Sequence, residues 1–354
     1  MKSRAVTRTS RYWVYSGLLL ILVQILACSL HNAHHPIPAI YYWKTQFKPE
    51  AYELGRWQEA SIKIVYLHCF DIIRDPESSQ LIPGVIIRDA PPTDQGLRFI
   101  PVIFITQDAI RQLPDKEIEP LAEKISGLVQ QLFPNAADPN EVQIDCDWTT
   151  LSRDTYFHLL KALHRQAFFQ HKQLSCTIRF HQIKFRLSAG IPPVDRAVLM
   201  CYNMGDLREV GAHNSILDLP LAQNYLQHLD HYPLKLDIAL PLFSWTLQFR
   251  DNHFMGILRD VQPEGIDSTN ANFISQGQHQ YRCLKDTFLK GNSIKSGDVL
   301  RTESPSEKDL LSISAFCSQR MDNDSLRVIF FHSDSLTLYK HPKHEIQAIL
   351  DAFQ

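Results

Sequence analysis

Two aspartates two residues apart are the strongest chemical signal in the sequence. Asp145 and Asp147 lie in the run 142–149, which is otherwise mostly apolar and typical of a strand. Side chains at i and i+2 of a strand face the same side, which puts the Cα atoms about 6.6 Å apart at ~3.3 Å per residue. Two such carboxylates must share a proton, meet a cation or have their pKa values pushed apart. We therefore predict that Asp145 and Asp147 are catalytic; the alternative is that they only hydrogen-bond neighbouring strands.

A basic pair occupies the next apolar run, at 174–181. Arg179 and His181 are also two residues apart and so share a face if this run is a strand. An arginine on the adjacent strand could bind a carboxylate with two hydrogen bonds. The imidazole could donate or accept a proton near neutral pH. We predict that both contribute to substrate binding, and a buried ion pair without a ligand is the alternative.

Aromatic and polar residues follow other apolar runs. Trp43, Tyr202, Asn203, Trp245 and Asp334 stand close to the ends of four such runs. Aromatic faces with a few polar groups between them suit sugar rings, which present C–H faces as well as hydroxyls. We therefore predict these five as substrate-binding residues, although aromatic side chains near strand ends often serve only as core.

The elements that must position these residues alternate along the chain. Helical spacing of apolar residues is clearest at 115–133 and recurs at 154–170, 221–229 and 345–353. Eight runs read as strands that are apolar on both faces, at 39–47, 62–73, 98–105, 141–148, 174–181, 196–204, 234–243 and 326–332.

This alternation predicts an α/β fold, a (β/α)₈ TIM-type barrel. The glycine fingerprint of an open dinucleotide-binding sheet is absent. The barrel would comprise 39–245 and 326–354, with a β-rich insertion at 246–325 between strands seven and eight. Barrel sites form at the carboxyl ends of the strands, where the residues above stand.

The amino terminus carries an export signal. Four basic residues up to Arg11 precede an apolar stretch at 13–27, shorter than the ~20 residues of a membrane span. The sequence Ile25-Leu26-Ala27-Cys28 resembles a bacterial lipobox. We predict a signal peptide at 1–27, lipidation of Cys28, a tether at 28–38 and an exported, membrane-anchored protein. A plain cleaved signal or a retained anchor are the alternatives.

Composition and motifs argue against several classes of ligand. The chain has 354 residues with 36 basic and 38 acidic side chains, so its net charge of −2 argues against nucleic acid. Neither a P-loop nor an HExxH motif occurs, and no metal or other cofactor is predicted. The six cysteines beyond Cys28 lack the close spacing of a zinc site, and we expect buried free thiols.

Two segments resemble family-18 glycoside hydrolases of the chitinase type. The run Asp145-Cys146-Asp147-Trp148 is similar to that family's strand-four motif, and Met200-Cys201-Tyr202-Asn203 is similar to its strand-six motif. The mature chain also resembles a family of bacterial envelope lipoproteins with a domain of unknown function, through 143–149, 177–182, 192–196, 202–206 and 239–245. Thr149 stands where the chitinase type has its catalytic glutamic acid, and threonine cannot protonate a glycosidic oxygen.

The site residues, Thr149 and the β-rich insertion lead to three functional hypotheses. The first is a hydrolase-like barrel that acts on a glycan through Asp145 and Asp147, with Asp206 or Asp334 as a further carboxyl. The second is a glycan-binding lipoprotein without turnover, which Thr149 favours. The third is an envelope assembly or scaffold protein that uses the insertion as its contact surface. The partner in the first two is a glycan or another envelope polymer, and the sequence specifies no protein partner.

Overall fold

A computed structural model describes residues 36–353, apart from 90–95, 135–138, 212, 231, 259–260, 262–265, 267–270, 322 and 324. The predicted signal peptide, Cys28 and most of the tether lie outside the described residues. Within the described part of the chain, no helix is long and apolar enough to span a membrane.

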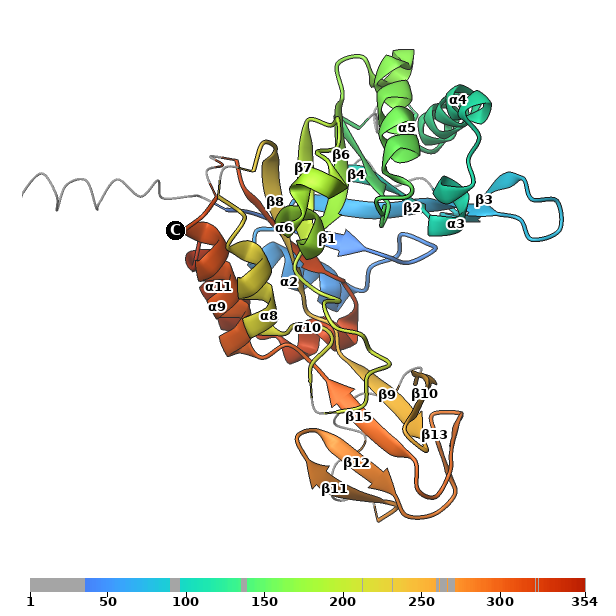
Figure 1. Ribbon diagram of the computed structural model, residues 1–354. Helices are drawn as coiled ribbons and strands as arrows, with labels where there is room; N and C mark the ends of the chain where they lie inside the picture. Colours follow the sequence, from blue (N-terminus) through green and yellow to red (C-terminus); the bar gives the residue numbers. More distant parts are fainter. Residues whose placement is uncertain are drawn as a thin grey trace, which may run out of the picture.

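Eight parallel strands close into a barrel, as predicted (Figure 1). The barrel closes because β1 pairs with β2 on one side and with β16 on the other. All five residues of β5 and of β7 are buried, as strands covered on both faces require. In barrel order the strands are β1 Ile37–Tyr42, β2 Ile64–Arg74, β4 Arg98–Ile105, β5 Glu141–Asp145, β6 Gln173–Arg179, β7 Arg196–Met200, β8 Lys235–Pro241 and β16 Arg327–Phe331.

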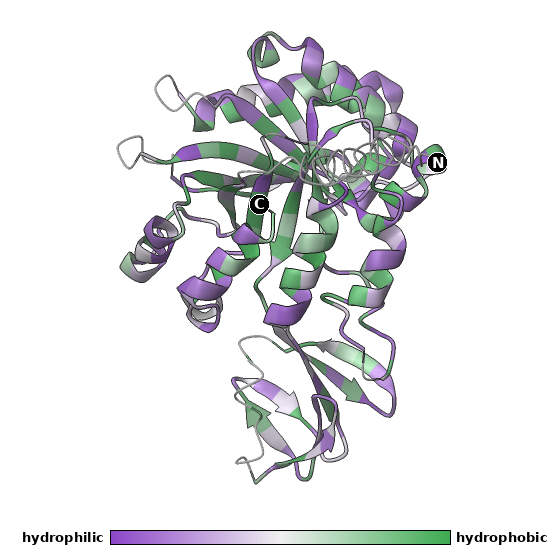
Figure 2. Ribbon diagram, turned by 90° about the vertical axis from the view of Figure 1, so that its left-hand side faces the viewer, coloured by the Kyte–Doolittle hydropathy of each residue, from purple (hydrophilic) through white to green (hydrophobic). Residues whose placement is uncertain are grey.

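Helices connect most of these strands and pack around the barrel. Hydrophobic residues are concentrated in the strands and on the inner sides of the helices (Figure 2). The helix predicted at 115–133 is α4, and its buried residues recur at helical spacing. The helices are α2 Ala51–Glu59, α3 Gln107–Arg111, α4 Asp115–Leu132, α5 Arg153–Arg165, α6 Phe180–Lys184, α7 Arg186–Ala189, α8 Leu219–Leu226, α9 Glu307–Ser318, α10 Ser335–Lys340 and α11 Lys343–Asp351, with a 3₁₀ turn at Ala167–Phe169.

Six of the eight barrel strands end earlier than the apolar runs predicted, including β5, β6 and β7. The strands expected at 141–148, 174–181 and 196–204 end at Asp145, Arg179 and Met200. Helix α6 begins directly after Arg179, and the backbone N–H of Asn203 donates to the carbonyl of Ile216 instead of to a strand. The residues beyond these ends therefore belong to loops and helix starts at the carboxyl rim of the barrel, where strand parity no longer sets their direction.

An edge strand was missed in the proline-rich connection after β2. Strand β3, Leu81–Ile86, pairs antiparallel with β2 and contains Pro83. Proline lacks the N–H that a central strand needs, but it is tolerated at an edge such as this one.

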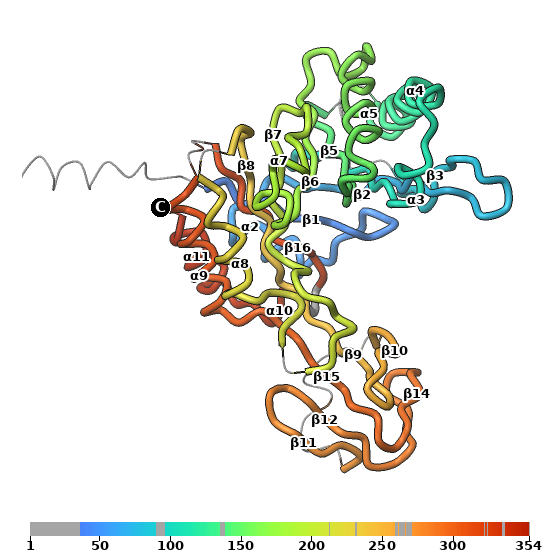
Figure 3. Tube along the Cα trace, viewed as in Figure 1, coloured from blue at the N-terminus to red at the C-terminus, as the bar shows by residue number. Residues whose placement is uncertain are grey.

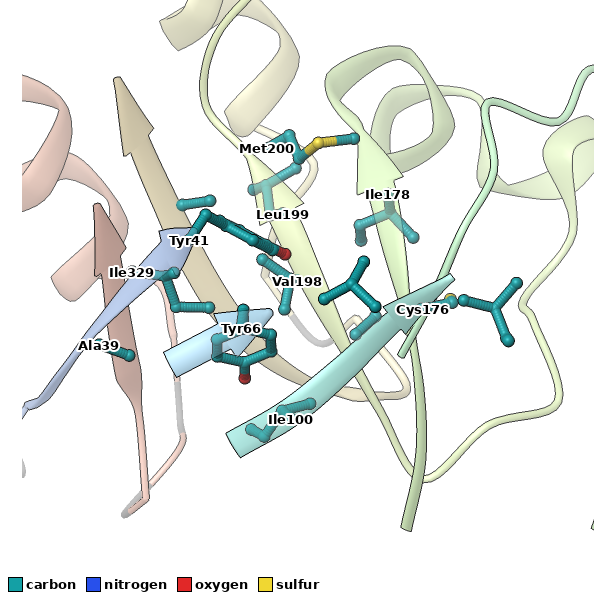
Figure 4. Close-up of a cluster of buried hydrophobic side chains, with 14 of the residues drawn as sticks. Ala39, Tyr41, Tyr66, Ile100, Cys176, Ile178, Val198, Leu199, Met200 and Ile329 are labelled. Carbon is teal, nitrogen blue, oxygen red and sulfur yellow. The ribbon is translucent and has the colours of Figure 1, made fainter. Parts of the chain in front are cut away.

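The barrel interior is filled by buried side chains from neighbouring strands. Figure 4 shows Tyr41 and Tyr66 near Ile100 and Val198 in this interior. The hydroxyl of Tyr41 donates to Oε1 of the buried Gln143 at 2.6 Å. The six cysteines of the described chain are buried and unpaired, as expected.

The insertion after β8 is a separate small sheet at the carboxyl rim (Figures 1 and 3). It has its own apolar cluster, which includes Phe273, Ile294 and Leu300. Its strands are β9 Trp245–Arg250, β10 His253–Ile257, β11 Phe273–Gly277, β12 Gln280–Cys283 and β15 Val299–Glu303, with the hairpin β13 Thr287–Leu289 and β14 Asn292–Ile294.

The predicted boundary of the insertion at 325 extends too far. Residues Leu310, Ile313 and Cys317 of α9 are buried in the barrel's core cluster, and α9 packs against α8 and α11. An apolar helix face with no strand partner must be buried against the nearest apolar layer, which here is the barrel. Helix α9 is therefore the crossover helix before β16.

Candidate functional site

Asp145 is the last residue of β5 and is almost enclosed. Its side chain is 8% exposed, and Oδ1 accepts a hydrogen bond from the hydroxyl of Thr177 on β6 at 2.6 Å. Burial, followed by the negative charge of Asp147, raises the pKa of Asp145 to about 6, against the opposing effect of the Thr177 hydrogen bond and of Arg179. Asp145 therefore holds its proton more tightly than an ordinary aspartate.

Asp147 differs from Asp145 because it lies beyond the strand and reaches solvent. Arg179 binds both of its oxygens, with Nε at 2.6 Å from Oδ1 and Nη2 at 2.9 Å from Oδ2. The Asp147 side chain is 44% exposed and that of Arg179 is 20% exposed. The cation expected from the adjacent strand is thus present, and the two predicted carboxylates are not equivalent.

The Asp147–Arg179 pair lines an open pocket at the carboxyl rim, which we call the rim pocket. Its volume is about 570 Å³, within the size range of small-ligand sites. The lining combines aromatic and polar side chains from the ends of β5, β6 and β7 and from helices α3, α6 and α8. The lining residues are Gln107, Arg111, Asp147, Trp148, Thr149, Arg179, Phe180, His181, Tyr202, Asn203, Met204 and Tyr225.

His181 lines the rim pocket, although, contrary to the prediction from the sequence, it is not on the same strand as Arg179. The chain turns into α6 after Arg179, so His181 occupies the first turn of that helix. Burial, and then the charge of Arg179, lowers the pKa of His181. The imidazole is therefore neutral at pH 7 and can offer one donor and one acceptor to a ligand.

Tyr202 and Asn203 also reach the rim pocket. Tyr202 is 3% exposed, and its ring stacks on Phe331 with centroids 5.0 Å apart. Burial raises the pKa of Tyr202 well above its usual value, so its hydroxyl stays protonated. Asn203 has a φ of 56°, a left-handed conformation that asparagine tolerates better than most residues. This conformation turns the chain into the β7–α8 loop, residues 201–218.

Three residues predicted as substrate-binding lie outside the rim pocket's lining. Trp43 stacks on His68 with ring centroids 4.5 Å apart, on the side of the barrel formed by β1 and β2. Asp334 caps α10 by accepting from the backbone of Thr337 at 2.6 Å, and it pairs with His332. These bonds lower the pKa of Asp334 to about 2 although burial opposes the change. Asp334 is thus explained by its role as a helix cap.

Trp245, the third of these residues, belongs to the junction between the barrel and the insertion. Its indole N–H donates to Oε2 of Glu303 at 2.8 Å. The same oxygen accepts from the backbone N–H of Ser215 at 2.9 Å, and Arg301 donates to Oε1 at 2.7 Å. Glu303 is 3% exposed, so this junction is a buried polar link between β15 and the β7–α8 loop.

A histidine–aspartate pair on β2 was missed by the sequence reasoning. Nε2 of His68 lies 2.7 Å from Oδ1 of Asp71, and Asp71 is close enough to contribute to the raised pKa of Asp145. Residues three apart face opposite sides of a regular strand, but the register shifts between His68 and Phe70 and the strand bulges there. The sequence did contain a signal for this pair, because His68 and Asp71 are polar residues inside the apolar run 62–73.

Among the described residues, no group of three or more histidine, cysteine, aspartate or glutamate side chains could hold a metal ion.

Solved structures share this architecture at low sequence identity. A chitinase from Chromobacterium violaceum ATCC 12472 is 11% identical with a TM-score of 0.55, and the match covers 89% of this chain and 99% of that one. The spore cortex-lytic enzyme SleL of Bacillus cereus is 13% identical with a TM-score of 0.52, covering 91% of this chain and 75% of that one. The chain has the barrel fold of these enzymes.

At this low level of sequence identity, the similarity establishes the fold and nothing more. The Bacillus megaterium QM B1551 SleL structure is similar to the same degree, at 10% identity and a TM-score of 0.54, covering 91% of this chain and 75% of that one. The sequence matches no protein-family model and no curated protein. What the rim pocket binds must therefore be argued from its own residues.

Proposed function

We propose that this protein binds a glycan in the rim pocket. The observation that carries the proposal is the Asp147–Arg179 pair, held in bidentate geometry at the wall of a pocket of about 570 Å³. A planar ion pair of this kind offers fixed donors and acceptors to sugar hydroxyls. Tyr225 of α8, which is partly exposed, supplies aromatic surface to the same pocket, and such surface suits the C–H faces of sugar rings.

Binding without hydrolysis is the form of this proposal that the pocket favours. Thr149 lines the pocket at the place where the resemblance to family-18 enzymes implies a catalytic glutamic acid. Both oxygens of Asp147 are occupied by Arg179, and Asp145 is not among the lining residues. The likeness in fold to a chitinase and to spore cortex-lytic enzymes supports a polysaccharide as the class of ligand.

Hydrolysis is the second candidate, and the pKa of Asp145 favours it. A carboxyl group with a pKa of about 6 can act as a general acid near neutral pH. A glycan ligand would have to reach Asp145 past Asp147, which requires Arg179 to release that side chain. A two-carboxyl mechanism would then need Asp147 as the partner of Asp145.

The decisive experiment is a screen of neutral and acidic oligosaccharides, followed by calorimetric titration of the best ligand. Asp147→Asn should weaken binding about tenfold or more, because the variant loses a charged hydrogen-bond acceptor and releases Arg179. Asp154→Asn is the matched control, since Asp154 pairs with Arg153 on the surface away from the pocket.

Each result separates the candidates. Binding without any release of reducing sugar supports the binding protein, whereas turnover that Asp145→Asn abolishes supports the hydrolase. A full screen without any ligand, or equal affinity of Asp147→Asn and wild type, would reject the rim pocket as a glycan site.

We further propose that the protein is exported and anchored through lipid on Cys28. The basic and apolar amino-terminal segment supports this, and Cys28 lies 37 − 28 = 9 residues before the first residue of β1. The start of β1 is at the amino end of the barrel, opposite the rim pocket, so an anchor there would leave the pocket facing away from the membrane. Incorporation of radiolabelled palmitate that Cys28→Ala abolishes is the expected result, and labelling of the variant would contradict it.

A further inference from the structure

A second cavity lies between the insertion and the β7–α8 loop, and we call it the insertion cavity. Its volume is about 370 Å³. Val210 and Gly211 of the loop form one wall, and β9, the β9–β10 turn, the β11–β12 hairpin and β15 form the others. In Figure 3 the loop that follows β7 runs toward β15 of the insertion. None of the residues that line the rim pocket lines this cavity.

The lining of the insertion cavity is mostly polar and mostly unpaired. Five of its polar side chains make no hydrogen bond to any described residue, so their donors and acceptors are available to a ligand. Three apolar side chains, Val210, Phe249 and Val299, also line it. The five unpaired side chains are those of Asp251, Asn252, Gln276, Gln280 and Arg282.

The charges of the insertion cavity cancel. Arg301 lines it but is engaged, because its Nε donates to Glu303 and its Nη1 and Nη2 donate to backbone carbonyls of the β7–α8 loop. Of the remaining charged groups in the lining, Arg282 is balanced by Asp251. A cavity of this kind has no net attraction for an anion or for a cation.

The chemistry that fits is a neutral group rich in hydroxyls. Each amide side chain carries both donors and an acceptor, as each sugar hydroxyl does, so three amides can match several hydroxyls in different orientations. Phe249 is 4% exposed and lies under the Arg301 guanidinium, with the Cζ atom 4.9 Å from the ring centroid, so it supports that side chain at the base of the cavity. A volume of about 370 Å³ is at the small end of ligand sites, which suits one or two sugar rings.

The insertion cavity is also pre-organised. Arg301 is 2% exposed and fixes the loop wall through three carbonyls, those of Leu207, Glu209 and Gly211. Gly211 has a φ of 145° and Gly297 a φ of 91°, conformations that side-chain-bearing residues rarely adopt. A wall held in place before binding lowers the entropy that a ligand must overcome.

We propose that the insertion cavity is a second carbohydrate-binding site, which takes a neutral mono- or disaccharide unit of a glycan. This site does not require the rim pocket to bind anything. The β7–α8 loop lines both sites, through Asn203 and Met204 at one and through Val210 and Gly211 at the other. One long glycan could therefore contact the barrel and the insertion together.

The test is a titration of the full, isotope-labelled chain with neutral tetrasaccharides of glucose and of N-acetylglucosamine, observed by NMR. We expect the side-chain amide signals of Gln276 and Gln280 to shift with at least one of them. Gln280→Ala and Arg282→Ala should each lower the affinity of this site about tenfold, because each removes hydrogen bonds to the ligand. Lys285→Ala, which removes an exposed charge from the insertion outside the cavity, should leave that affinity unchanged.

Two controls separate this site from the rim pocket and from an anion site. Asp147→Asn should leave the shifts of Gln276 and Gln280 intact even if binding at the rim is lost. Tetragalacturonate should shift these signals less than the neutral ligands do. Unchanged signals with every neutral tetrasaccharide, a stronger response to tetragalacturonate, or the same loss of affinity in Lys285→Ala would each overturn the proposal.

Discussion

The two ends of the barrel contain the same kind of ion pair in opposite surroundings. At the amino end, Arg196 binds both oxygens of Asp237, with Nε and Nη2 at 2.8 and 2.5 Å. At the carboxyl rim, Arg179 binds Asp147 through the same two nitrogen atoms at 2.6 and 2.9 Å. The side chains at the amino end are 6% and 0% exposed, whereas those at the rim are 20% and 44% exposed.

The amino-end pair belongs to a closed network. Arg327 donates to Glu141 at 2.6 Å and to the hydroxyl of Tyr66 at 2.7 Å, and its backbone N–H donates to Asp237. Burial raises the pKa of Asp237, and the charges of Arg196 and Arg327 oppose this rise. Bidentate geometry alone therefore does not indicate a functional site. The Arg196–Asp237 pair is buried at the amino end of the barrel, whereas the Arg179–Asp147 pair lines the rim pocket.

The largest effect should follow removal of the charge at the closed end. Asp237→Asn leaves Arg196 and Arg327 buried with one carboxylate fewer, and this should lower the free energy of unfolding by about 3–5 kcal/mol. Urea unfolding followed by circular dichroism measures the change. A loss below about 1 kcal/mol would show that the amino-end pair is no more structural than a surface pair.

The second largest effect should be a pH dependence of the free energy of unfolding that comes from Asp145. Its pKa is about 6 in the folded chain and about 3.9 when unfolded. Between these values the folded state binds the proton more tightly, so the free energy of unfolding falls as pH rises through this window. The total change is about 3 kcal/mol.

Asp145→Asn removes this titration while it keeps an acceptor for Thr177. Its free energy of unfolding, relative to wild type, should therefore rise by about 2 kcal/mol between pH 4 and pH 7, which is most of the total change. Parallel urea titrations at the two pH values measure the difference. A difference that stays constant would mean that Asp145 titrates normally in the folded chain.

The smallest effect on stability should come from the rim pair. Asp147→Asn breaks a partly exposed ion pair, which is worth about 0–1 kcal/mol. The same variant should show the loss of glycan affinity described above. If its unfolding free energy instead fell as far as that of Asp237→Asn, the rim pair would be structural and its role in binding would lose its main support.

The sequence predicted most of the neighbourhood of the rim pocket, because it is built from the ends of consecutive strands. Asp147, Arg179, His181, Tyr202 and Asn203 were found in this way, and all five line the pocket. Trp148, Thr149 and Met204 adjoin these residues in the loops after the strands, although they were not predicted to bind a ligand. The other lining residues that were not predicted come from helices, since nothing local indicates which helix will approach a strand end. These unpredicted helical residues are Gln107, Arg111, Phe180 and Tyr225.

Three residues were predicted to bind substrate because they follow a strand, and they do not line the rim pocket. Trp245 was assigned to the site because it follows β8, but it starts β9 and bonds to Glu303, which is 58 residues away in sequence. Trp43 and Asp334 follow strands that end on another side of the barrel, outside the rim pocket. Nearness to a strand end places a residue at the rim, but it does not place it at a particular point of the circle.

The sequence by itself determined the alternation of strands and helices and the end of the barrel at which the charged residues collect. Both follow from local periodicity of apolar residues, which backbone hydrogen bonding and burial impose on each segment separately. Only the tertiary structure decided that Asp145 is enclosed and that Asp147 is open to solvent. The exposure of a side chain depends on neighbours from distant strands, here Thr177 and Arg179, and no local pattern of residues records their distance.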